Sequence, residues 1–161
     1  MARVMVLGLG NIIYKDKGLG IYAVRDLYRE QWPEGVCFVD RMMLGDIPLD
    51  LDGVHGLLVL DAWQAGDSPG NLARLSLDQV QARPELISEP LFWRGLALAE
   101  VLGQDVHVVF LGLEAECADC DLSLSPSVQD AYPRFLEAVR EEIFHMLNGL
   151  VMGRAGGAVW A

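Results

Sequence analysis

The chain has 161 residues, 52% of them hydrophobic, and a formal net charge of −11. This length and apolar content predict one globular domain with a substantial core and argue against a disordered chain. The negative charge disfavours binding to nucleic acids and anionic membranes, because both would repel it. Every apolar run is shorter than the roughly 18 residues that span a bilayer, and no charged leader precedes the first expected strand. We therefore expect a cytoplasmic protein whose partners include neither nucleic acid nor membrane.

Short apolar runs and helical spacings alternate along the chain. The first half predicts a strand over 3–7, a helix over 20–31, a strand over 36–40, a short helix within 45–51 and a strand over 56–60. The second half predicts an edge strand over 72–77, a helix over 91–102, a strand over 106–111 and a helix over 126–150, with loops over 64–71 and 114–125 and an irregular stretch over 82–90. This alternation indicates an α/β fold, a three-layer αβα sandwich with a mostly parallel central sheet. We expect residues 1–152 to form a single domain and the Gly- and Ala-rich residues 153–161 to be a frayed tail.

Polar and glycine-rich segments follow the carboxyl ends of the expected strands. The first strand leads into Gly8–Lys17, the second ends at Asp40 and the third ends at Asp61. Such segments converge at one edge of a parallel sheet, where ligands bind. The candidate residues of this cluster are Gly8, Gly10, Asn11, Asp16 and Asp40, with Lys17 and Asp61 beside them.

The first loop has some features of a nucleotide-binding turn. Gly8 and Gly10 open it, but the next glycines, Gly18 and Gly20, come too late for the dinucleotide fingerprint. The sequence also lacks the Lys-Ser or Lys-Thr pair of a phosphate-binding Walker motif. We therefore favour another use for these glycines.

Cys117 and Cys120 form a lone C-x-x-C motif, and Cys37 is the remaining cysteine. An odd number of cysteines without an export signal argues against a disulfide framework. A zinc site would need two more ligands, and a thioredoxin-like pair would stand at the start of a helix, whereas loop sequence follows here. A structural or incidental role is favoured, with redox or metal chemistry as the alternatives.

The loop after the first strand matches a longer pattern. It reads Gly-x-Gly-Asn, four residues, Asp-Lys, then Gly-x-Gly, the matching residues being Gly8, Gly10, Asn11, Asp16, Gly18 and Gly20. With these residues the chain closely resembles the hydrogenase maturation endopeptidases, in which a Glu stands at the position of Lys17. The resemblance continues through Asp61-Ala62, Ser68–Gly70, the segment 95–102, Phe110–Gly112 with Glu116, and Leu122–Pro126. It covers nearly the whole chain and implies the same three-layer α/β fold.

The resemblance also implies a metal site, from which this chain departs. In the family a Glu, an Asp and a His bind a metal, and the equivalent positions here are Lys17, Asp61 and Arg94. A Lys can ligate only as a neutral amine, and an Arg guanidinium stays protonated and cannot ligate. We therefore predict no metal and no other cofactor at these positions, although the family uses the nickel of its substrate for recognition. The three histidines, at other positions, are His55, His107 and His145.

The two cations offer a substitute for the charge of the metal. If they flank Asp61, they compensate a buried carboxylate that would otherwise be costly. We therefore expect Lys17 or Arg94 to lie within salt-bridge distance of Asp61. Asp16 and Asp40 remain as possible additional ligands. After Asp40, the sequence Arg41-Met42-Met43 replaces the family's Gly-Gly-Thr.

The family trims a C-terminal tail from the nickel-loaded large subunit of nickel-iron hydrogenases. By resemblance, we expect a maturation factor whose partner is a hydrogenase large-subunit precursor. Because two of the three ligand positions carry cations, we favour a metal-free, catalytically impaired member that binds or assembles the subunit. Two alternatives stay open: an active endopeptidase that removes the tail, and an unrelated small-molecule binder on the same scaffold.

Overall fold

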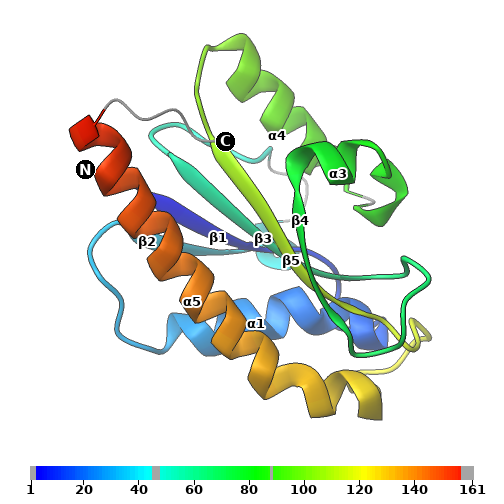
Figure 1. The fold of residues 1–161 in the computed structure, drawn as a ribbon. Helices are drawn as coiled ribbons and strands as arrows, with labels where there is room; N and C mark the ends of the chain where they lie inside the picture. The colour runs from blue at the N-terminus through cyan, green and yellow to red at the C-terminus, as the bar shows by residue number, and fades with distance from the viewer. Residues whose placement is uncertain (1–2, 45–47, 88, 157–161) are drawn as a thin grey trace.

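A computed structural model of the protein describes residues 3–44, 48–87 and 89–156. Its centre is a five-stranded sheet with the order β2-β1-β3-β5-β4 (Figure 1). The strands are β1 (Val4–Gly8), β2 (Val36–Asp40), β3 (Gly56–Trp63), β4 (Leu72–Ser76) and β5 (His107–Glu114). Strands β2, β1, β3 and β5 pair in parallel, and the edge strand β4 runs antiparallel to β5. The mostly parallel sheet predicted from the sequence is confirmed.

Helices cover both faces of this sheet (Figure 1). The described helices are α1 (Leu19–Tyr28), α2 (Arg41–Leu44), α3 (Leu77–Gln81), α4 (Pro90–Val101) and α5 (Pro126–Gly156), with 3-10 turns at Lys15–Gly18 and Pro84–Leu86. Helices α1 and α5 pack on one face, and α3 and α4 pack on the other. The result is the expected three-layer sandwich. None of the helices in the described ranges combines the length and apolar character that a membrane span requires.

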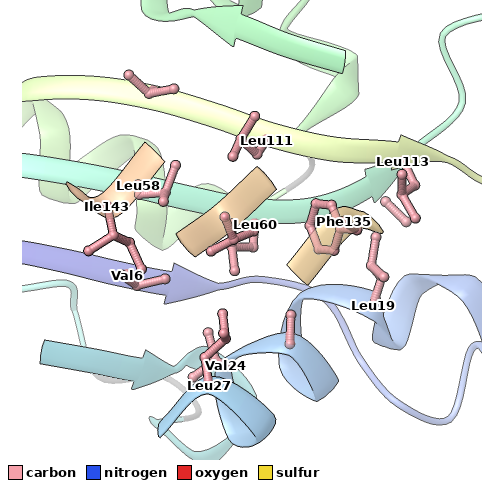
Figure 2. Close-up of a cluster of buried hydrophobic side chains, with 14 of the residues drawn as sticks. Val6, Leu19, Val24, Leu27, Leu58, Leu60, Leu111, Leu113, Phe135 and Ile143 are labelled. Carbon is pink, nitrogen blue, oxygen red and sulfur yellow. The ribbon is translucent and has the colours of Figure 1, made fainter. Parts of the chain in front are cut away.

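The core has two halves, one on each face of the sheet. Successive residues of a strand point to opposite faces, so Leu58 and Leu60 of β3 face α1 and α5, whereas Leu57 and Val59 face the other layer. Figure 2 shows the first half, where side chains of the sheet meet those of α1 and α5. Because both faces are packed, the ends of β1 and β3 are held in a fixed register.

The third strand is longer than its sequence predicts. β3 continues to Trp63, because it pairs with β5 until Trp63 lies opposite Glu114. Asp61 therefore belongs to the strand itself, paired in register with Gly112, and does not stand at its end. This placement gives Asp61 the rigidity of the sheet.

Three helical segments also differ from the prediction. Helix α3 follows β4 where no helix is expected, and a capping box between Ser76 and Gln79 begins it. A short helix is expected within 45–51, of which 45–47 lie outside the described residues and 48–51 are not helical. Helix α5 continues to Gly156, into the segment expected to be a tail.

Candidate functional site

The loop between β1 and α1 folds back on itself and reaches Asp61. Gly10 has a φ of 107°, and a Cβ there would lie 1.9 Å from the Lys17 carbonyl oxygen and 3.5 Å from Oδ1 of Asp61. A side chain at this position would therefore collide with the loop. Asn11 supports the same turn, because its N–H donates to the Lys17 carbonyl at 2.9 Å and its Oδ1 accepts from the Ile13 N–H at 3.1 Å. Gly10 and Asn11 thus shape the loop that positions Lys17.

Gly8, another predicted site residue, has a packing role. It is the last residue of β1, and a Cβ there would lie 2.3 Å from the carbonyl oxygen of Gly20. This close contact lets α1 start directly against the end of β1. The strand ends and the loop are thereby held as one unit.

Asp61 is the buried carboxylate of the site. It is 5% exposed, and its Oδ1 accepts a hydrogen bond from the Ala62 N–H at 2.8 Å. Burial raises the pKa of this carboxyl to about 6, while the positive charge of Lys17 and the Ala62 hydrogen bond oppose the shift. The negative charge of Glu89 raises the pKa further. Asp61 therefore changes its charge near pH 6, well above the range of an ordinary Asp.

Lys17 brings its positive charge beside this carboxylate without binding it directly. The Lys17 Nζ donates a hydrogen bond to the Ala62 carbonyl oxygen at 2.6 Å. Its charge favours the ionised form of Asp61. Among the described residues, however, the ion pairs within 4.0 Å do not include Lys17 with Asp61. The expected salt bridge is thus replaced by a contact with the neighbouring backbone carbonyl.

Arg94 does not join the site. It is exposed on α4, and it makes no ion pair with a residue in the described ranges. Glu89, just before α4, acts on Asp61 instead: its negative charge raises the pKa of the Asp61 carboxyl. Glu89 was not among the predicted site residues, because the family pattern gives the position of a residue along the helix but not the direction of its side chain. The sequence signal that could have identified Glu89 is its position immediately before Pro90, where the helix begins.

Asp16 is a structural clamp. It is fully buried, and its Oδ2 accepts from the N–H groups of Glu116 and Cys117, both at 2.9 Å. The Ser125 hydroxyl donates to the same oxygen at 2.6 Å, and the Ser125 N–H donates to Oδ1 at 2.7 Å. These four hydrogen bonds fasten the loop before α1 to the loop before α5. Asp16 therefore has little capacity left for a metal.

Asp40, at the end of β2, is also engaged. Its Oδ2 accepts from Nε of Arg25 on α1 at 2.7 Å. The next residue, Arg41, is buried, with only 3% of its surface exposed. A large cation thus stands at this strand end, where the resemblance predicts glycine.

The C-x-x-C motif lies in the loop that Asp16 holds. Both thiols are free, with Cys117 half-buried and Cys120 exposed. The Cys117 Sγ accepts a hydrogen bond from the Asp119 N–H at 3.5 Å, and the Cys117 carbonyl accepts one from the Asp16 N–H at 3.2 Å. The backbone of Cys117 therefore contributes to the Asp16 clamp, in keeping with a structural role.

The side chains present do not fit the metal that the resemblance implies. Within the described residues, no group of three or more His, Cys, Asp and Glu side chains is arranged to hold a metal ion. At the expected position Asp61 stands beside an ammonium group, which repels a divalent cation. His55 and His107 lie at the amino ends of β3 and β5, the opposite edge of the sheet from Asp61. The arrangement is that of a carboxylate, Asp61, whose negative charge is compensated by the ammonium group of Lys17.

Comparison with known proteins gives one consistent family. The sequence profile described as hydrogenase maturation protease matches residues 21–142. The hydrogenase expression/formation protein HupD of Bradyrhizobium diazoefficiens is 30% identical over 136 residues, covering 80% of this chain and 71% of that protein. HupD of Thiocapsa roseopersicina is 29% identical over 157 residues, covering 86% of this chain and 66% of that protein, which is just under two thirds of its length.

Solved structures with the same fold carry related names. The hydrogenase maturating endopeptidase HybD from E. coli superposes with a TM-score of 0.73 at 23% identity, covering 89% of this chain and 93% of that one. The [NiFe] hydrogenase maturation protease HybD from Thermococcus kodakarensis gives a TM-score of 0.65 at 22% identity, covering 86% and 97%. At such identities these matches establish the α/β fold.

Proposed function

Because the chain belongs to the hydrogenase maturation protease family, we propose that it acts in hydrogenase maturation as a metal-free, catalytically impaired binding or assembly factor. Its partner in this proposal is the large-subunit precursor of a [NiFe] hydrogenase. The nickel that the family recognises then belongs to that substrate. No resident cofactor is part of the proposal.

The observation that carries the proposal is the contact between Lys17 and Ala62. The ammonium lies 2.6 Å from the Ala62 carbonyl oxygen, beside the carboxylate where a divalent cation would otherwise bind. A protonated amine has no lone pair to offer a metal. Lys17 therefore supplies positive charge to Asp61 but no Lewis acid, and no metal-bound nucleophile can be generated this way.

The scaffold around this contact supports binding. The Gly10 turn and the four hydrogen bonds of Asp16 keep both loops in place at the strand ends. A rigid loop edge can present a surface to a partner even where the chemistry of the family is lost. In this proposal the protein therefore still recognises its partner but does not cleave a peptide bond.

The test uses the purified protein and the nickel-loaded precursor of the hydrogenase large subunit. Size-exclusion chromatography would detect a complex, and mass spectrometry of the precursor would detect loss of its C-terminal tail. We expect a complex whose precursor keeps its full mass. An Asp61→Ala variant serves as the control for any cleavage that is seen.

Two other results of this experiment would contradict the proposal. Tail removal that is lost in Asp61→Ala would identify an active endopeptidase and overturn the impaired-factor proposal. If neither a complex nor cleavage is detected, the large subunit is not the partner, and the alternative of a small-molecule binder is favoured.

A further inference from the structure

The C-x-x-C motif lies on a short segment whose two ends are both attached to the loop between β1 and α1. At one end, the Cys117 carbonyl accepts a hydrogen bond from the Asp16 N–H at 3.2 Å, and the Cys117 N–H donates to Asp16 Oδ2 at 2.9 Å. At the other end, the Asp121 carbonyl accepts from the Lys15 N–H at 2.9 Å, and the Asp121 N–H donates to the Ile13 carbonyl at 3.0 Å. Neighbouring residues of the opposite loop therefore hold both ends of the segment.

This attachment folds the segment 117–121 back on itself. Four residues of extended chain span about 13–14 Å, whereas the carbonyls of Cys117 and Asp121 accept hydrogen bonds from two consecutive amides. Cys120, which precedes Asp121, is thereby brought back toward Cys117. The Asp119 N–H donates to Cys117 Sγ at 3.5 Å, so this sulfur lies against the part of the segment that leads to Cys120. The two thiols thus stand at the two ends of one short bend.

The two thiols differ in exposure. Both are free, and Cys120 is exposed together with its neighbours on both sides, whereas Cys117 is half-buried. An exposed thiol meets a reagent first, and a second thiol close by can resolve the product. Cys37 on β2 is half-buried, and burial raises the pKa of its thiol, which makes it the less reactive cysteine.

We propose that Cys117 and Cys120 form a redox modification site, which a low-molecular-weight disulfide oxidises to an intrachain disulfide bond. The Cys120 thiolate attacks one sulfur of the external disulfide, forms a mixed disulfide and releases one thiol. The Cys117 thiolate then attacks the Cys120 sulfur, closes the intrachain bond and releases the second thiol. The protein loses two electrons and two thiol protons, and the external disulfide is reduced to two thiols. The inference goes beyond the proposed function and does not depend on it.

The disulfide would act on the loop that carries Lys17. A bond between the two cysteines constrains the segment that accepts from the Lys15 and Asp16 N–H groups. Lys17 is the next residue of this loop. Oxidation should therefore make the loop that positions Lys17 open less often.

The test treats the reduced chain with hydroxyethyl disulfide, a small neutral disulfide, and afterwards with dithiothreitol. Mass spectrometry of a digest would show a peptide that spans both cysteines and has lost two hydrogens. Hydrogen exchange followed by NMR reports on the loop through the Lys15 and Asp16 amides. We expect their exchange to slow about tenfold on oxidation and to recover on reduction. Cys117→Ser should stop at a mixed disulfide on Cys120, because the resolving thiol is missing.

The matched control is Cys37→Ser, which should form the same disulfide as the wild type and show the same change in exchange. Cys117→Ser/Cys120→Ser should show neither effect, and circular dichroism and the Tm verify that each variant is folded. A wild type that keeps a mixed disulfide on Cys120, or that forms only intermolecular disulfides, would overturn the proposal. An intrachain bond that leaves the exchange of the Lys15 and Asp16 amides unchanged would overturn its link to the loop.

Discussion

Asp16 and Asp61 are both buried carboxylates near the loop that follows β1, yet their surroundings differ. Asp16 receives four hydrogen bonds from the chain segment before α5. Asp61 receives one from Ala62 and depends on the nearby charge of Lys17. A fully hydrogen-bonded carboxylate serves the fold, whereas a buried carboxylate with one hydrogen bond depends on the charges around it.

The largest effect is expected at the Asp16 clamp. Asp16→Ala would leave three backbone N–H groups and a hydroxyl without their acceptor, so we expect unfolding free energy to fall by about 3–5 kcal/mol. Urea denaturation measures the change. Asp67→Ala is the matched control, because exposed Asp67 also caps a loop, through the Ser68 N–H, and should cost less than about 1 kcal/mol. Similar losses of unfolding free energy in the two variants would show that Asp16 stabilises the fold no more than a residue in a surface turn does.

The second effect concerns pH at Asp61. A carboxyl whose folded pKa is about 6 rather than 3.8 binds its proton more tightly when folded. Its contribution to stability is therefore highest below pH 3.8 and is lost as pH rises through the window to about 6. Relative to the wild type, Asp61→Asn should gain about 3 kcal/mol of unfolding free energy across that window. Paired denaturation curves at several pH values between 4 and 7.5 would show it, and parallel curves for the two proteins would contradict the raised pKa.

A smaller effect is expected at Lys17. Lys17→Met removes both the hydrogen bond to the Ala62 carbonyl and the charge beside Asp61, at a cost of about 1–2 kcal/mol at neutral pH. Lys15→Met, in the same loop, should change unfolding free energy by less than about 0.5 kcal/mol. The Lys17 variant should also shift the Asp61 titration upward, because the favourable charge is gone. An unchanged titration in Lys17→Met would show that the ammonium does not act on Asp61.

The sequence allowed the scaffold to be predicted because its signals are local. Continuous apolar runs such as Leu57–Leu60 identify buried strands, and the spacing of Ile21, Val24 and Leu27 identifies α1. Helix α3 was missed because five residues carry too little periodicity, although its Ser76 and Gln79 capping box was visible. The end of β3 depended on its pairing with β5, which is a tertiary contact.

The site was predictable in position but not in contacts. The motif positions predicted that the Gly10 loop, Lys17 and Asp61 lie close together. In the structure they do, because β1 and β3 are neighbours in a parallel sheet. It could not show that Arg94 faces solvent while the charge of Glu89 acts on Asp61, since helix rotation depends on packing. The roles of Lys17, Asp61 and Arg94 as replaced ligand positions remain a prediction.

Isothermal titration calorimetry with nickel and zinc would show whether Asp61 takes part in binding a metal. We expect no stoichiometric binding at Asp61, so wild type and Asp61→Ala should give the same heats. A Cys117→Ser/Cys120→Ser variant identifies any metal taken up by the exposed thiols. Tight one-to-one binding that survives in the cysteine variant and disappears in Asp61→Ala would show that a metal takes the place of Lys17 beside Asp61, and the protein would then not be metal-free.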